Sequence, residues 1–111
     1  MHTAPLATAQ CRPCRGDAAA LSEAAAAELL QQIPAWSRED KLIVRRFAFR
    51  DYAETMAFVN AVAWIAQGQD HHPDLEVAYD KCVVRYTTHA VGGLTENDFI
   101  CAAKIDRVFA L

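Results

Sequence analysis

The stretch that decides the fold runs over residues 70–98 and reads DHHPDLEVAYDKCVVRYTTHAVGGLTEND. It contains three of the chain's four histidines, His71, His72 and His89. A proline follows the adjacent pair, and proline restricts the residue before it to extended backbone. A helix that precedes the pair must therefore end near residues 69–70.

Two segments of alternating apolar and polar residues follow, residues 75–79 and 82–88, with Asp80 and Lys81 between them. This pattern predicts a β-hairpin with a short polar turn. Because a hairpin brings its outer ends together, we expect the histidine pair to lie near His89. Three imidazoles would then converge without a metal ion to gather them.

The rest of the chain predicts three helices and at least one more strand. Serine, aspartate and threonine are placed to cap the helices, and a proline stops the first one. The helices are expected over residues 22–32, 51–68 and from 95 onward, and the strand over 42–49 with a partner beginning at Trp36 and Ser37. Helices, strands and a hairpin in this order predict an α+β domain, with an antiparallel sheet covered on one face by helices.

The two longer helices each carry apolar stripes that are expected to face the sheet. In the helix over 51–68 the stripe is Tyr52, Met56, Val59, Ala63 and Ala66, flanked by Phe58, Val62 and Ile65, and Trp64 is expected to pack at its edge. In the last helix it is Cys101, Ala102, Ile105, Val108 and Phe109, with Asp98 on its continuation.

Composition describes an ordinary globular protein. The 111 residues are 53% hydrophobic and 23% charged, which fits one domain, expected over 21–111, after a frayed tail over 1–20. The net charge of −3 provides no basic field for nucleic acid. No apolar run reaches the ~20 residues of a membrane span, and we see no secretory signal pattern. We therefore expect a cytoplasmic protein.

Cys11 and Cys14 form a C-R-P-C motif in the tail. It has no second C-x-x-C and does not sit between a strand and a helix, so we expect neither a metal site nor a redox motif there. Cys82 and Cys101 are expected to be buried, reduced thiols.

The central stretch resembles the pterin-4a-carbinolamine dehydratases. The resemblance rests on D-H-H-P, V-x-Y, T-T-H and G-L-T-E-N-D, in order and at the family's separations, and it extends upstream through Trp36 and R-R-F-A-F-R-D-Y. About the last three quarters of the chain is covered. The resemblance implies a four-stranded antiparallel sheet with three helices packed on one face, and assembly into a homodimer or homotetramer.

The resemblance also implies a function: loss of water from 4a-hydroxytetrahydrobiopterin to give quinonoid dihydropterin. Imidazoles suit this elimination because an unperturbed pKa of ~6.5 makes both protonation states accessible. No cofactor is expected, since the pterin is the substrate. The catalytic residues would be His71, His72, His89 and Asp98, and the substrate-binding residues Trp36, Asp70, Pro73 and Thr88.

Within this set, His71 and His89 are assigned to acid–base transfer and His72 to holding the substrate, with acid and base left open. Asp98 has two interpretations: a carboxylate that orients an imidazole, and the acidic member of a capping box with Thr95. Trp36 has a second one as a core aromatic. The resemblance further implies a pterin-dependent aromatic amino acid hydroxylase as the source of substrate.

Three alternatives stay open. The histidines could merely terminate their elements, or form a three-histidine zinc site, although adjacent residues in extended backbone diverge. The chain could instead be a non-catalytic dimerisation or coactivator-type binding partner, using the alanine-rich helix over 21–30. One departure from the family is Gln67, where many members carry glutamate, which puts any carboxylate role there in doubt.

Overall fold

The computed structural model describes residues 5–13 and 19–111. Three α-helices, four strands and two short 3₁₀ helices follow one another in these residues. In chain order they are η1 (Leu6–Thr8), α1 (Glu23–Leu30), β1 (Ser37–Glu39), β2 (Leu42–Ala48), α2 (Tyr52–Gln69), β3 (Asp74–Val77), β4 (Lys81–Tyr86), η2 (His89–Val91) and α3 (Glu96–Phe109).

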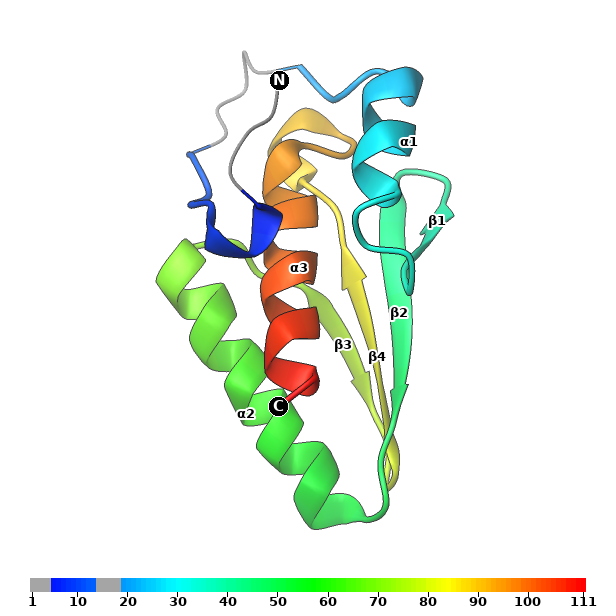
Figure 1. Ribbon diagram of the computed structural model, residues 1–111, viewed down its shortest axis with the longest axis vertical. Coiled ribbons are helices and arrows are strands. Elements are labelled where there is room, and N and C mark those ends of the chain that lie inside the picture. The colour runs from blue at the N-terminus through cyan, green and yellow to red at the C-terminus, as the bar shows by residue number, and fades with distance from the viewer. Residues whose placement is uncertain (1–4, 14–18) are drawn as a thin grey trace.

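The strands form one antiparallel sheet in the order β1-β2-β4-β3. In its register Phe47 of β2 lies opposite Cys82 of β4, and Leu75 of β3 lies opposite Val84. Helix α3 crosses in front of the sheet with α2 beside it, and α1 lies next to the start of α3 (Figure 1). The predicted α+β class, with four antiparallel strands and three helices, is confirmed.

Two turns complete the sheet. Between β1 and β2 the chain turns at Asp40 and Lys41, with a positive φ of 55° at Asp40, and Glu39 pairs with Leu42 across the turn. The β3–β4 turn lies at Tyr79 and Asp80, one residue earlier than predicted, because the Ala78 N–H donates to the Lys81 carbonyl (2.9 Å) and Lys81 already belongs to β4.

Helix α2 turns a different face to the core from the one its apolar pattern predicted. The buried residues are Thr55, Phe58, Val62 and Ala66, whereas Tyr52 and Ala63 are exposed. Trp64 is 82% exposed and does not pack within the chain. Both faces of this helix are apolar, so periodicity alone could not choose between them. In α3, Phe109 likewise remains 39% exposed.

The expected frayed tail is not frayed over residues 5–13. Leu6 is only 7% exposed and belongs to the hydrophobic core, and η1 packs against α3. The Lys104 ammonium donates to the Ala7 carbonyl (3.0 Å). This part of the chain is irregular but buries an apolar side chain, a contact that leaves no periodic signal in the sequence.

Helix α2 ends in a Schellman motif at the histidine pair. Asp70 adopts the left-handed conformation (φ 51°, ψ 44°), and its N–H donates to the carbonyls of Ala66 and Gln67. The His71 N–H donates to the Ala66 carbonyl (3.1 Å), which completes the motif. The predicted stop is confirmed, and this cap fixes the backbone of His71.

No helix in the described parts of the chain combines the length and apolar character required to cross a membrane.

Candidate active site

The three histidines of the central stretch line one pocket of about 470 Å³. Its wall is built from the end of α2, the start of the hairpin, the residues after β4, the start of α3 and the N-terminal segment. The lining residues are Cys11, Arg12, Pro13, Gly68, Gln69, Asp70, His71, His72, Thr87, Thr88, His89, Ala90 and Asn97. The predicted convergence of the hairpin ends is therefore present in the structure.

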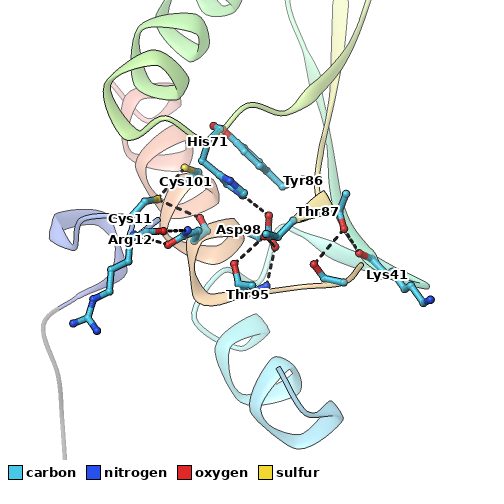
Figure 2. Close-up of polar contacts among 12 residues, drawn as sticks. Cys11, Arg12, Lys41, His71, Tyr86, Thr87, Thr95, Asp98 and Cys101 are labelled. Carbon is cyan, nitrogen blue, oxygen red and sulfur yellow. Dashed lines mark hydrogen bonds and ion pairs between the residues drawn. The ribbon is translucent and has the colours of Figure 1, made fainter. Parts of the chain in front are cut away.

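His71 is held by a buried carboxylate. Its Nε2 lies 2.6 Å from Oδ1 of Asp98, whose side chain is fully buried, while 12% of the His71 side chain remains exposed (Figure 2). With Nε2–H donating to the carboxylate, Nδ1 is the ring nitrogen left for exchange with a bound molecule.

The other oxygen of Asp98 accepts two more hydrogen bonds. The Thr88 hydroxyl donates to Oδ2 (2.8 Å), and so does the Thr95 backbone N–H (2.9 Å). Thr88 and Thr95 also join their hydroxyls at 2.8 Å. Asp98 thus closes the capping box of α3 and binds His71 at the same time. Both interpretations of this residue hold in the geometry.

Two opposing effects set the pKa of His71. Burial lowers it, but the hydrogen bond and the negative charge of Asp98 outweigh burial, so the pKa of His71 is raised above its ordinary value. Cys101 and Asp70 act in the same direction as Asp98. The imidazolium form therefore persists to a higher pH than in a free histidine.

Tyr86 supports the imidazole from β4. The two rings stack with centroids 5.2 Å apart and an interplanar angle of 12°. The Tyr86 hydroxyl donates to the His71 carbonyl (3.0 Å), so both the ring and the backbone of His71 are positioned by this fully buried tyrosine.

Sequence comparison now assigns the chain to a family. A family model described as pterin 4 alpha carbinolamine dehydratase matches residues 19–108. The chain belongs to the pterin-4-alpha-carbinolamine dehydratase family. A relative from Nitrosospira multiformis, provisionally named as such a dehydratase, is 56% identical over 106 residues, which cover 96% of this chain and 94% of the relative. One from Stenotrophomonas maltophilia with the same provisional name is 61% identical over 102 residues, which cover 90% and 88%.

One solved structure supports this assignment, and a second shares the fold. A crystal structure from Brucella melitensis, described as a transcriptional coactivator/pterin dehydratase, superposes with a TM-score of 0.77 at 32% identity and covers 80% of this chain and 97% of that one. A pterin dehydratase-like protein identified as a RuBisCO assembly factor of the α-carboxysome shares the fold, with a TM-score of 0.55 at 24% identity.

The dehydratase-family residues expected at the site fall into three groups. Asp70, His71, His72, Thr88 and His89 line the pocket. Asp98 lies behind its wall, in contact with His71. Pro73 and Trp36 are not among the lining residues.

Trp36 is 3% exposed and forms part of the core. Its Nε1–H donates to Oδ1 of Asp106 (2.8 Å), and its ring packs edge-on against Phe47. Arg45 donates to the same oxygen (2.7 Å). Within one chain of this dehydratase-family protein, the core interpretation of Trp36 is the one that the structure supports.

The N-terminal segment forms part of the pocket wall, a contribution that was not predicted. The Cys11 N–H donates to the Gln69 side chain (2.8 Å), and the Arg12 backbone exchanges two hydrogen bonds with the Asn97 amide (2.9 and 2.6 Å). These contacts hold Cys11, Arg12 and Pro13 against the site. The C-R-P-C motif was the one available signal, and it pointed to other chemistry.

Gln67, the departure from the family pattern, is exposed and absent from the pocket lining. Its carbonyl serves the cap at Asp70. In the described residues, no three histidine, cysteine or acidic side chains are grouped to hold a metal ion.

Proposed function

We propose that the chain dehydrates a pterin-4a-carbinolamine to the quinonoid dihydropterin by histidine acid–base catalysis. The observation that carries the proposal is the contact between His71 and the buried Asp98 in the wall of a pocket that also holds His72 and His89. The pocket volume is within the range that binds small molecules.

The reaction breaks the C4a–O bond and forms a double bond between C4a and the neighbouring ring nitrogen. The leaving oxygen must gain a proton, and the nitrogen must lose one. We assign the first transfer to His71, because Asp98 raises its pKa and keeps the imidazolium available near neutral pH. The proton would leave from Nδ1, since Nε2 faces Asp98.

His89 would accept the proton from the ring nitrogen, because it lines the same pocket from the opposite end of the hairpin. His72 and Asp70 would contact the substrate. Thr88 has a different role from the one expected: its hydroxyl is engaged by Asp98 and Thr95, so we assign it to holding the carboxylate. The reaction is an elimination, so it requires no redox cofactor.

Stopped-flow absorbance of quinonoid dihydropterin formation from 4a-hydroxytetrahydropterin tests this proposal. We expect His71→Gln and His89→Gln each to lose about 10²-fold or more in kcat/KM, with circular dichroism unchanged. Glu28→Gln, an exposed change on α1, is the control that should keep full activity. A folded wild-type protein that does not accelerate the step above background would overturn the proposal.

The physiological setting follows as part of the same proposal. A pterin-dependent aromatic amino acid hydroxylase would supply the carbinolamine, and dehydration would return its pterin to the reductive cycle. A purified pterin-dependent hydroxylase should complete more turnovers per pterin when this protein is added, and the His71→Gln variant should not produce this increase.

We also propose that the chain self-associates through the outer face of α2. Trp64 is 82% exposed and Tyr52 53%, and both lie on this helix. Such apolar exposure is typical of a protein interface. Helix α1, the other candidate surface, uses Ala26, Leu29 and Leu30 within the chain's own core.

The test is the molar mass by light scattering. We expect wild type to be a dimer or tetramer and Trp64→Glu to shift toward the monomer. Ala27→Glu places the same charge on the exposed face of α1 and should leave the mass unchanged. A shift with Ala27→Glu alone would instead favour α1 as the contact surface, the arrangement expected for a helix-mediated binding partner.

A further inference from the structure

Two cysteines from distant parts of the chain meet beside the pocket. The Sγ atoms of Cys11 and Cys101 are 3.5 Å apart, although 90 residues separate them in sequence. Cys11 is half-buried and lines the pocket, whereas Cys101 is fully buried. Figure 2 shows the two side chains next to each other, with Cys101 on α3. Cys11 therefore belongs to the pocket wall, and the sulfur of Cys101 lies in contact with its sulfur inside the protein.

The surroundings of Cys101 favour its thiolate. Hydrogen bonds from Cys11 and Tyr86 and the positive charge of His71 lower the pKa of Cys101, against the opposing effects of burial and Asp98. The hydrogen bond to Cys101 and burial raise the pKa of Cys11. Of the two sulfurs, Cys101 is therefore the one that gives up its proton more readily, and the thiolate is the nucleophilic form of cysteine.

From this contact we propose that Cys11 and Cys101 form a redox-active pair that closes to a disulfide when a peroxide enters the pocket. Cys11 passes its proton to Cys101 across the 3.5 Å contact, and the Cys11 thiolate is oxidised by the peroxide to a sulfenic acid with loss of one water. The Cys101 sulfur then attacks that sulfur, the S–S bond forms, and the sulfenic oxygen departs as a second water. In total two thiols and one hydrogen peroxide give one disulfide and two waters.

The bond would fix the N-terminal segment to the pocket wall. That segment is held at the pocket because the Cys11 N–H donates to Gln69 and the Arg12 backbone exchanges two hydrogen bonds with Asn97. Closing a loop of this length reduces the freedom of the unfolded chain, so we expect oxidation to raise Tm by about 10 °C. Cys101 is one of the groups that raise the pKa of His71, and a disulfide carries no charge, so the bond would weaken that effect.

Peptide mapping identifies the bond. The fully reduced protein is treated with hydrogen peroxide under native conditions, alkylated, and digested with trypsin without reductant. Trypsin places Cys101 in the peptide 86–104 and Cys82 in 82–85, whereas Cys11 and Cys14 share a peptide because proline follows Arg12. Matched Cys11→Ser and Cys14→Ser variants separate these two. Cys14 itself lies outside the described residues.

We expect wild type and Cys14→Ser to lose two hydrogen atoms in mass, to yield the cross-linked peptide with 86–104, and to gain Tm reversibly with dithiothreitol. Cys11→Ser should show none of these changes. A bond between Cys11 and Cys14, seen as a mass loss that persists in Cys101→Ala, would overturn the proposal. So would a wild type whose mass and Tm do not change. The readouts are independent of dehydratase activity, so they stand or fall separately from the proposed function.

Discussion

Asp98 links His71 to the start of α3, because its two carboxylate oxygens bind different partners. Oδ1 faces His71, and Oδ2 accepts from Thr88 and from the N-cap of α3. A buried carboxylate is costly unless it is paired and hydrogen-bonded, and these contacts meet that requirement.

Replacing the carboxylate by an amide tests its effect on His71. Asp98→Asn should lower kcat/KM roughly 10²-fold or more and move the alkaline limb of the pH profile to lower pH, because the charge that raises the pKa of His71 is removed. The His71 ring proton followed by NMR titration gives the pKa directly. If kcat/KM of Asp98→Asn falls but the alkaline limb of its pH profile stays at the same pH, Asp98 acts only by supporting the fold.

The same contact makes stability depend on pH. The folded pKa of His71 lies above 6.5, its ordinary value, so its ion pair with Asp98 stabilises the fold fully below pH 6.5 and is lost as the pH rises through the folded pKa. The difference in unfolding free energy between wild type and His71→Gln, measured by urea denaturation, should therefore shrink above pH 6.5. A difference that grows with pH would contradict the assigned ion pair.

The hydroxyl of Thr88 can be removed almost without change of shape. Thr88→Val leaves Oδ2 of the buried carboxylate with one donor fewer, which should cost about 1–3 kcal/mol of unfolding free energy. Thr88→Ser keeps the donor and should recover most of that loss in the same urea titration. Equal losses in both variants would show that the methyl group, rather than the hydrogen bond, is what matters.

At the scale of elements, two glycines provide a matched pair. A Cβ at Gly68, in the last turn of α2, or at Gly92 would meet no atom within 4 Å. Only Gly92 has a positive φ, 68°, which disfavours a side chain. Gly68→Ala should stabilise the fold by about 0.5–1 kcal/mol, and Gly92→Ala should destabilise it by about 1 kcal/mol. The same sign for both in thermal and urea unfolding would contradict this account of the turn.

The elements and the histidine cluster followed from the sequence because each depended on local chemistry. Helix caps, the proline after His72 and the hairpin pattern all act within a few residues. The face of α2 did not follow, because Thr55 is core and Tyr52 is exposed on a helix that is apolar all round. Which face of α2 is buried depends on the sheet against which the helix packs, and on the outer face that we propose binds a second copy of the chain.

The site extends beyond those local signals. Asp98 and His71 were both expected, but the contact of Cys11 with Cys101 and the clamp of Asn97 on Arg12 join segments more than 80 residues apart. No pattern within the N-terminal segment could indicate them. Trp36 was expected near the pocket only because of the family resemblance, whereas in the structure its indole N–H donates to Asp106.

At the scale of the molecule, the N-terminal segment belongs to the folded body. Leu6→Ala should lower the unfolding free energy by about 2 kcal/mol or more, since it empties a buried site against α3. Thr8→Ala, exposed on the same short helix, is the matched control and should change it by less than ~0.5 kcal/mol. Equal, small effects would mean that the segment detaches from the domain in solution.

The double duty of Asp98 has a consequence for heat inactivation. The carboxylate that orients the imidazole also begins α3, and α3 carries Phe99, Ile100 and Ile105 of the core. The contact between Asp98 and His71 therefore stays in place as long as the first turn of α3 is folded, and it is lost when that turn unfolds. Activity should therefore be lost at the temperature where the whole domain melts, with no inactive but folded species in between.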